Sequence, residues 1–288
     1  MEKVKISVII PTCDRLDLLD RAIKSVINQT FTDLEVIIVD DGKKTSAENL
    51  VKSIADNRIR YFKNQKSGAP SARNFGVSMA CAELISFLDD DDEYLPNKLQ
   101  KEVDIMNKFG NEIGFVFCEV YNNYVQENFK ERSVIKEFGK NNFFDLIILH
   151  KIRILTPTIL IKKEVFNAVG GFDDDLVSNQ EWDLMIRVGK KYIGYCLNEP
   201  LVNVYIDNSR EHVGGNLSRR IAGRLAIINK HIILLKNNPK ILAIHYFYIA
   251  IFYKRDKKTL QFIFYLFKYF YFMCINLLRK IIVKNNFS

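Results

Sequence analysis

The sequence predicts an α/β fold in which a mostly parallel sheet is covered by helices. Short apolar, β-branched runs recur at residues 6–10, 35–39, 59–63 and 84–88, and helix-like stretches separate them. Strands that are apolar throughout are typical of a sheet that is covered on both faces. Strands that alternate with helices pair in parallel through crossover connections.

The expected helices lie near residues 15–29, 45–55, 70–80 and 97–109. In the first of them, apolar residues recur at the spacing that fills one face of a helix: Leu16, Leu19, Ile23, Val26 and Ile27. Beyond residue 111 the pattern is less regular, and it predicts two strands, a glycine turn and a helix: 115–118, 158–161, Gly170–Gly171 and 181–190.

The chain has 288 residues and 48% hydrophobic content, which suits one large domain or one domain with an extension. Its formal charge of +8 is concentrated at the C-terminus, because residues 241–288 alone carry a net charge of +7. The rest of the chain is almost neutral, whereas binding to a phosphate backbone requires clustered cations. We therefore expect no nucleic acid among the partners.

The five cysteines are widely scattered and none forms a Cys-x-x-Cys pair. This pattern argues against a disulfide framework and against a zinc site, and it favours the reducing cytoplasm. The apolar run at residues 6–10 is too short for a signal peptide, so export is not expected.

A change of composition divides the chain into an expected domain of residues 1–223 and a helical, basic and aromatic extension of residues 224–288. The last 48 residues hold 14 of the 35 aromatic residues. Lys268 interrupts their apolar run, which makes the run a poor candidate for crossing a bilayer. The preferred interpretation is an amphipathic helix on an anionic membrane surface; the alternative is an oligomer interface or a helical cap on the core.

Polar residues follow three of the predicted strands. Pro11–Asp14 follows the first strand, Asp40–Gly42 the second and Asp89–Asp92 the fourth. In parallel sheets covered by helices, ligands bind beyond the carboxyl ends of the strands. We therefore expect the three segments to meet in one crevice.

The Asp89–Asp92 segment is the most informative of the three. Carboxylates this close repel one another and raise each other's pKa. A hard divalent cation that also binds phosphate oxygens is their natural partner. The alternative is a solvated acidic turn or a negatively charged helix N-terminus.

Five ordered motifs over residues 4 to about 190 resemble glycosyltransferase family 2. They are Ser7–Thr12, Val36–Gly42, Gly68–Gly76, Phe87–Asp92 with Tyr94–Pro96, and Gly170–Asp173. Members of this family are inverting nucleotide-sugar transferases, and the resemblance implies that the predicted sheet has the GT-A fold.

The resemblance implies a donor site at the first two strand ends. Asp41 would accept a hydrogen bond from the nucleotide base, and its alternative is a turn residue before glycine. Pro11, Thr12 and Asp14 would lie on the donor side, with Thr12 and Asp14 flanking the base. Cys13 stands where many relatives have a tyrosine that packs on the base, which bears on the expected preference for a UDP-sugar.

The resemblance also implies phosphate and metal contacts. Arg73 would face the nucleotide, with a surface helix arginine as the alternative. Asp91 would bind Mn²⁺ or Mg²⁺, and Asp89 or Asp90 would contact ribose hydroxyls or metal-bound water; the ion would bridge the two phosphates. His212 is a candidate third ligand, although a lone loop histidine more often has no such role.

The catalytic base is expected near residue 181. Glu181 takes the position of the family's aspartate that deprotonates the acceptor hydroxyl. Asp183 is the second candidate, and its alternative is an ion pair with Arg187 one helical turn away. Trp182 either stacks on an acceptor sugar or belongs to the core.

The resemblance implies a metal-dependent, inverting transferase that moves a hexose or N-acetylhexosamine to a hydroxyl of a glycan or lipid-linked acceptor. The enzyme would lie at the inner face of the cell membrane and serve bacterial surface polysaccharide synthesis. The alternatives are a catalytically inactive nucleotide-sugar binder or scaffold, and a nucleotidyltransferase. A dehydrogenase is not expected, because no Gly-x-Gly-x-x-Gly follows the first strand.

Overall fold

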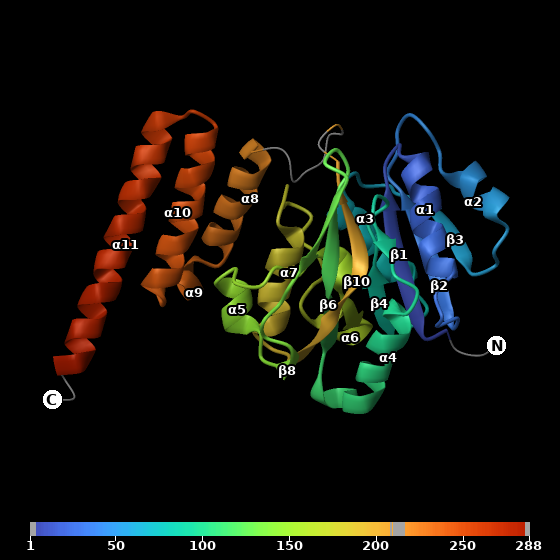
Figure 1. Ribbon diagram of the computed structural model, residues 1–288, viewed down its shortest axis with the longest axis horizontal. Coiled ribbons are helices and arrows are strands. Elements are labelled where there is room, and N and C mark those ends of the chain that lie inside the picture. Colours follow the sequence, from blue (N-terminus) through green and yellow to red (C-terminus); the bar gives the residue numbers. More distant parts are fainter. Residues whose placement is uncertain (1–3, 208, 210–216, 286–288) are drawn as a thin grey trace. The chain divides into compact units, whose positions relative to one another are not determined.

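The computed structural model describes residues 4–207, 209 and 217–285 (Figure 1). The chain forms two compact units: Met1–Asp174 with Glu181–Arg210, and Asp175–Gln180 with Glu211–Ser288. The described strands belong to the first unit, and the C-terminal helices belong to the second. The predicted change of domain at residue 224 stays a prediction.

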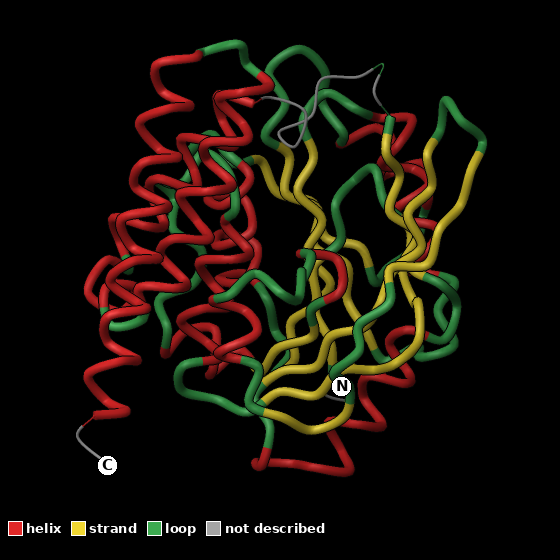
Figure 2. Tube along the Cα trace, turned by 60° about the vertical axis from the view of Figure 1, so that its left-hand side comes forward, coloured by secondary structure: helices red, strands yellow, loops and turns green. Residues whose placement is uncertain are grey.

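The first unit is built on one mixed sheet, whose strands are yellow in Figure 2. Its strand order is β3-β2-β1-β4-β9-β6-β10-β5, with β7 beside β6 and β8 beside β10. The strands are β1 (Ile6–Thr12), β2 (Leu34–Asp40), β3 (Ile59–Lys63), β4 (Leu84–Phe87), β5 (Glu93–Tyr94), β6 (Phe115–Tyr124), β7 (Phe129–Ser133), β8 (Gly139–Asn141), β9 (Leu160–Lys162) and β10 (Gly194–Ile206).

The first four strands pair in parallel in the order β3-β2-β1-β4, and β6 and β10 are also parallel. Strand β9 lies between β4 and β6 and is antiparallel to both. The predicted α/β fold with a mostly parallel sheet is therefore confirmed for the half of the sheet that carries the strand-end motifs.

Seven α-helices accompany the sheet in the described part of the first unit. They are α1 (Leu16–Ile27), α2 (Glu48–Ile54), α3 (Ala69–Met79), α4 (Lys98–Phe109), α5 (Phe144–Ile148), α6 (Lys163–Ala168) and α7 (Gln180–Gly189). The four helices predicted before residue 111 agree with α1 to α4 within a few residues at each end.

Both faces of the central strands are covered, as their continuous apolar sequences predicted. Side chains alternate between the faces of a strand. Val8 and Ile10 of β1 belong to the core that also contains Leu19 of α1 and Val103 of α4, all buried. Ile9, on the opposite face, faces α3, where a Cβ at Gly76 would lie 2.4 Å from its Cγ2 atom. Gly76 therefore allows α3 to pack closely on β1.

The largest difference from the predicted elements is β10, which the sequence did not indicate. Its strand pattern is interrupted at Asn198–Pro200, and the register with β6 shifts on both sides of Pro200. The residues after this interruption, Leu201 and Val202, are buried beside β6. Burial against a strand distant in sequence therefore stabilises a strand that its own sequence only weakly favours.

The second unit consists of helices in its described part. They are α8 (Leu217–Lys230), α9 (Ile232–Lys236), α10 (Pro239–Arg255) and α11 (Thr259–Asn285). Aromatic rings join α10 to α11: the ring centroids of Tyr246 and Phe272 are 5.6 Å apart, and those of Tyr253 and Tyr265 are 5.4 Å apart. These contacts make the two helices a hairpin.

Lys268 does not prevent α11 from being long and apolar enough to cross a membrane. The stretch Thr259–Arg279 has a mean hydropathy of 1.3 over its most apolar window, and none of the residues in that window is buried. The Lys268 Nζ lies 4.6 Å from the Phe264 ring centroid and 5.0 Å from that of Tyr246. Its ammonium therefore rests on aromatic faces within the hairpin. By length and composition alone, α11 is therefore a candidate span, although Lys268 made its apolar run a poor one in the sequence.

A buried polar cluster lies directly behind the acidic segment. The Lys98 ammonium is 2.7 Å from a Glu102 carboxylate oxygen, and both side chains are fully buried. Lys98 also donates to Ser86 Oγ at 3.3 Å, and Tyr94 donates its hydroxyl to the Phe87 carbonyl at 2.5 Å. This bond joins Tyr94, which follows the Asp89–Asp92 segment, to Phe87, which precedes it. Burial raises the pKa of Glu102 to about 7, against the lowering effect of Lys98.

Lys98→Met should destabilise the protein by about 3–5 kcal/mol at pH 8, because it leaves a buried carboxylate without its partner. The double variant Lys98→Met/Glu102→Leu should recover most of that loss. A carboxyl whose pKa is raised by folding binds more protons folded than unfolded, so the free energy of unfolding falls as pH rises from about 4.5 to about 7. Urea denaturation at pH 5 and pH 8 should therefore show a smaller defect at pH 5.

Candidate active site

The three strand-end segments meet at one edge of the sheet, as predicted. Thr12, the last residue of β1, donates its hydroxyl to Asp90 Oδ2 at 2.8 Å. The carbonyl of Thr12 accepts the backbone N–H of Asp41 at 2.8 Å. The end of β1 therefore lies between the segment after β2 and the segment after β4, which agrees with its central place in the sheet.

The two aspartates after β2 have different environments. Asp40 is buried and accepts hydrogen bonds from the backbone of Gly42 and Ala47 and from the Tyr61 hydroxyl. Asp41 is partly exposed, and its Oδ2 accepts the backbone N–H of Gly68 at 2.8 Å. Asp40 therefore shapes the turn, whereas the carboxylate of Asp41 stays partly accessible at the strand end.

Asp14 holds the loop that follows β2. Its backbone is in the left-handed region, with φ of 55°. Its Oδ1 accepts the backbone N–H groups of Lys44 at 2.9 Å and Thr45 at 2.8 Å. The Thr45 bond and its neighbours lower the pKa of Asp14 to about 2. A Cβ at Gly42 would lie 2.8 Å from both Asp14 Oδ1 and the backbone oxygen of Thr45, so this position requires glycine.

The four acidic residues after β4 divide into two buried and two partly exposed side chains. Asp90 and Asp92 are buried, whereas the side chains of Asp89 and Asp91 are 30% and 31% exposed. Asp92 accepts the backbone N–H of Tyr205 at 3.1 Å. Burial raises the pKa of Asp90 to about 7, and it raises the pKa of Asp92 well above its usual range. Two carboxylates thus stay partly accessible to solvent, and two are buried within the segment.

Arginines lie among these carboxylates, which the sequence analysis did not anticipate. Arg15 contacts Asp90 Oδ1 at 2.6 Å and Asp91 Oδ2 at 2.9 Å. Arg73 forms a hydrogen-bonded ion pair with Asp89. The signal for Arg15 was its position, immediately after the strand end that carries Asp14. Guanidinium groups therefore neutralise part of the repulsion that the sequence assigned to a metal ion.

Arg73 is almost fully buried, at 6% exposure, which excludes the alternative of a surface helix arginine. It lies in α3, which begins after Gly68, where φ is 121°. Its guanidinium carbon is 5.4 Å from the ring centroid of Phe172. The side chain is thus held between an aromatic ring and Asp89.

The partly exposed carboxylates are hard oxygen ligands of the kind that Mn²⁺ and Mg²⁺ prefer. The described residues include no group of three His, Cys, Asp or Glu side chains arranged around one metal position. Asp89 and Asp91 fit a divalent ion that obtains further ligands from the phosphates of a bound nucleotide. His212 lies outside the described residues.

Glu181 lies in the first turn of α7, after Asn179, whose φ is 58°. It lines a small cavity together with His150 and Arg153. Burial raises the pKa of Glu181, the positive charges of Arg153 and Arg73 lower it, and Asp89 raises it. Glu181 is thus in electrostatic reach of the Arg73–Asp89 pair.

Trp182 and Asp183 are both buried. The Trp182 indole N–H donates to the Ile147 carbonyl at 2.8 Å, and its ring also lines the cavity beside Glu181. Asp183 accepts hydrogen bonds from Arg187 at 2.6 and 2.9 Å, which is the ion pair named as its alternative. Of the two candidate bases, Glu181 is therefore the one that faces a cavity.

Two bacterial proteins have sequences similar to part of this chain. An uncharacterized glycosyltransferase of Rickettsia typhi is 31% identical over 201 residues, which are 66% of this chain and 61% of that protein. A GalNAc(5)-diNAcBac-PP-undecaprenol beta-1,3-glucosyltransferase of Campylobacter jejuni is 39% identical over 139 residues, 47% of this chain and 42% of that protein. The chain thus spans less than two thirds of either relative.

Solved structures share the fold. S. aureus TarS, residues 1–349 in complex with UDP-GlcNAc, has a TM-score of 0.68 at 17% identity, covering 92% of this chain and 80% of that one. A mannosyltransferase of Pyrobaculum calidifontis, in complex with GDP-Man and Mn²⁺, has a TM-score of 0.58 at 16% identity. The match covers 79% of this chain and 64% of that one.

The family model described as Glycosyl transferase family 2 matches residues 7–170, more than half of the chain and all three strand-end segments. The sheet order and the meeting of the strand-end segments at one edge agree with that match. The chain therefore belongs to glycosyl transferase family 2.

Proposed function

We propose that this protein transfers a sugar from a nucleoside-diphosphate donor to a hydroxyl of a glycan or lipid-linked acceptor, with inversion at the anomeric carbon. The observation that carries the proposal is the meeting of Asp41, the Arg73–Asp89 pair and Asp91 around the end of β1, with Glu181 in electrostatic reach. Family membership and the UDP-GlcNAc in the complex of the similar TarS structure support it.

The donor would lie across the carboxyl ends of β1, β2 and β4. Asp41 would accept a hydrogen bond from the base, with Pro11, Thr12 and Asp14 beside it, and a UDP-sugar is the proposed donor. Asp89 and Asp90 would lie next to the ribose and the diphosphate. The guanidinium of Arg73 would bind a phosphate oxygen in place of Asp89.

Asp91 and Asp89 would hold Mn²⁺ or Mg²⁺, which would supply positive charge to the diphosphate as it leaves. The Mn²⁺ in the complex of the similar mannosyltransferase supports this assignment. Arg15 forms an ion pair with Asp91 in the structure, so this pair would have to break when the ion binds.

Glu181 would act as the base. Its carboxylate takes the proton of the acceptor hydroxyl while the hydroxyl oxygen forms a bond to the anomeric carbon. The bond from that carbon to the diphosphate breaks, and its electron pair leaves with the nucleoside diphosphate. Attack opposite the leaving group inverts the configuration and requires no covalent enzyme intermediate.

The proposal is tested by incubating the protein with UDP-GlcNAc or other UDP-sugars, Mn²⁺ and membrane lipid extracts that contain lipid-linked saccharides. Release of UDP and a product of inverted configuration are expected. Release of sugar 1-phosphate, the leaving group when the uridylyl group is transferred, would indicate a nucleotidyltransferase, and donor binding without turnover would indicate a catalytically inactive binder.

We also propose that α11 binds the inner face of the cell membrane. Large apolar side chains are exposed along it, among them Phe264, Phe267 and Phe270, and the region 241–288 carries a net charge of +7. Aromatic and basic side chains together favour an anionic bilayer surface. Bacterial surface polysaccharide synthesis, in which acceptors are lipid-linked, is the proposed setting, and the lipid-linked substrate in the name of the Campylobacter relative supports it.

Phe264→Asp/Phe267→Asp should lower binding to phosphatidylglycerol vesicles by about 10-fold or more, because two apolar side chains are lost and two negative charges are gained. The measurement is sedimentation of the protein with vesicles.

Phe129→Asp is the matched control, because Phe129 lies on β7 of the sheet and is 55% exposed, like Phe264 at 54%. Equal losses in both variants would contradict the assignment of α11 as the membrane-binding segment. Unchanged binding in the α11 variant would indicate that the helix is a protein interface.

A further inference from the structure

The cavity beside Glu181 contains a cationic side chain that the proposed donor site does not use. Its polar lining includes Glu181, His150 and Arg153, and Ile152 and Met185 contribute apolar side chains. Arg73 and Asp89 act on Glu181 electrostatically, but neither belongs to the described residues that line the cavity. The cavity has a volume of about 10 Å³, room for one water-sized group. Glu181 therefore connects the donor-side ion pair with a separate space that a hydroxyl group can enter but a whole sugar cannot.

Arg153 differs from the other arginines near the site. Arg15, Arg73 and Arg187 each form an ion pair with an aspartate. Arg153 is exposed, and it forms no hydrogen bond or ion pair with the residues that the structure describes. Its guanidinium thus retains its full set of donors at the edge of the cavity.

The wall that presents Arg153 is well supported. The backbone N–H of His150 donates to the Ile147 carbonyl at 2.9 Å, and that of Lys151 donates to the Leu146 carbonyl at 2.9 Å. The ring centroids of His150 and Trp182 are 4.6 Å apart, so the two rings pack against each other. A structured loop and a packed aromatic pair therefore place the guanidinium beside Glu181.

We propose that the acceptor lies at the mouth of this cavity and that Arg153, exposed at its edge, binds an anionic group of the acceptor, either a phosphate or a carboxylate. A planar guanidinium binds both groups through paired hydrogen bonds. The inference rests on the proposed function, because it makes an anion part of the substrate class. A phosphate would come from the link between a saccharide and its lipid, and a carboxylate from an acidic sugar of the glycan.

The charge of Arg153 also has a role next to the base. An acceptor anion near Glu181 would repel its carboxylate and favour the protonated form, which cannot accept a proton. The guanidinium between them offsets that repulsion. Arg153 is therefore a specificity-determining residue for the acceptor and does not itself transfer the proton.

Trp182 is the only tryptophan in the chain and lines the cavity, so its fluorescence reports binding there. The probes are glucose 1-phosphate, glucuronic acid and glucose, titrated into the full-length protein. We expect a saturable change with one or both anionic probes and none with glucose at equal concentration. Arg153→Gln should raise the apparent Kd of the responding probe about 10-fold or more, the effect of losing a charge-assisted hydrogen bond.

Lys151→Gln is the matched control, because Lys151 is an exposed cation of the same loop that does not line the cavity. Its apparent Kd should stay near the wild-type value, and Arg153→Lys should retain part of the affinity. The inference is overturned by an equal response to glucose, by no response to any probe, or by equal losses in Lys151→Gln and Arg153→Gln.

The two anionic probes distinguish between the two possible sources of the acceptor's negative charge. A response to glucose 1-phosphate alone indicates the phosphate link, and a response to glucuronic acid alone indicates an acidic sugar. The readout needs no turnover, so it is independent of UDP release. A protein that releases UDP but shows no anion binding would retain the proposed function and lose this inference. A protein that binds the anions but transfers no sugar would retain this inference and lose the proposed function.

Discussion

Glu181→Gln is expected to lower the transfer rate by about 10²-fold or more while leaving donor affinity unchanged. Glutamine has nearly the same shape as glutamate but cannot accept a proton from the acceptor hydroxyl. Glu181 also contributes no contact to the proposed donor site, so binding of UDP should be retained. The measurements are the rate of UDP release with acceptor present and UDP affinity by calorimetry.

The pH profile provides a second test of Glu181. The base must be ionised, so activity should fall on the acid side as pH decreases through its pKa. Burial raises that pKa, so the acid limb should lie above the range of an exposed glutamate. Arg153 lowers the pKa, and Arg153→Gln should therefore move the limb toward higher pH.

Glu164→Gln is the control for Glu181→Gln, because both acids lie in the first turn of a helix, Glu164 in α6 and Glu181 in α7. Glu164 is exposed. A general effect of charge at a helix N-terminus would appear in both variants. Near-normal turnover in Glu181→Gln would exclude this residue as the base.

Asp91→Asn is expected to abolish Mn²⁺-dependent activation and to reduce turnover by about 100-fold or more, since several kcal/mol of charge stabilisation on the leaving diphosphate would be lost. Asparagine preserves the size of the side chain and removes the negative ligand. The Mn²⁺ affinity, measured by electron paramagnetic resonance with UDP present, should fall in parallel. Activity that survives in chelated buffer at the wild-type level would contradict the metal assignment.

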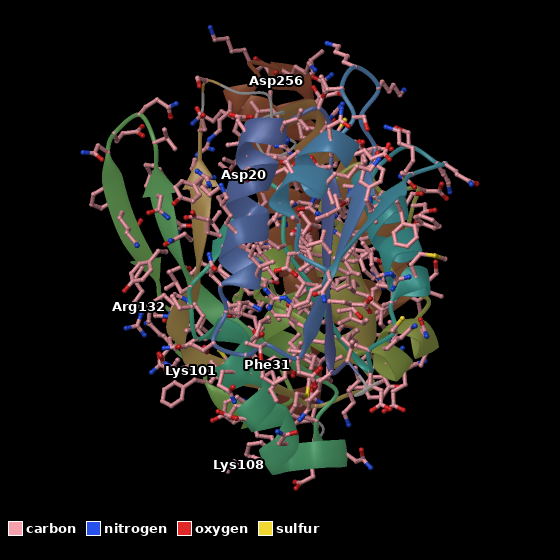
Figure 3. All side chains as sticks on the ribbon, turned by 90° about the vertical axis from the view of Figure 1, so that its right-hand side faces the viewer. Asp20, Phe31, Lys101, Lys108, Arg132 and Asp256 are labelled. Atoms are coloured by element: carbon pink, nitrogen blue, oxygen red, sulfur yellow. The ribbon has the colours of Figure 1, made fainter. Side chains whose placement is uncertain are left out.

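Asp20→Asn is the matched control for Asp91→Asn. Figure 3 shows Asp20 on α1. The side chain of Asp20 is 33% exposed, and its Oδ2 atom lies 2.6 Å from Lys24 Nζ. Asp91 is 31% exposed and 2.9 Å from Arg15, so the two carboxylates have similar exposure and similar partners. Arg15→Gln removes the cation that competes for Asp91, and it should leave Mn²⁺ affinity unchanged or higher.

The N-terminal half of the fold followed from local sequence. Strands such as β1 and β2 are apolar throughout, and α1 has an apolar face, so each element was predicted independently of its neighbours. Strand β10 was not predicted, because its middle residues are polar and it depends on pairing with β6, about eighty residues away. Sequence periodicity cannot record a pairing between distant segments.

The candidate site was predictable to the level of segments. The rule that ligands bind at the carboxyl ends of parallel strands led to Asp41 and to Asp89–Asp92, and the resemblance led to Arg73 and Glu181. The assignment of individual side chains within the acidic segment was beyond the sequence. Four consecutive aspartates look equivalent in a sequence, yet Asp90 and Asp92 are buried while Asp89 and Asp91 remain partly exposed.

The sequence alone determined the α/β class, the meeting of the strand ends and the family, because these depend on local patterns and ordered motifs. Only the tertiary structure decided which arginine pairs with which aspartate. Arg15 is 76 positions from Asp91 along the chain, yet the two side chains form an ion pair. Coulomb energy depends on distance in space and on burial, and both arise only when distant segments pack together.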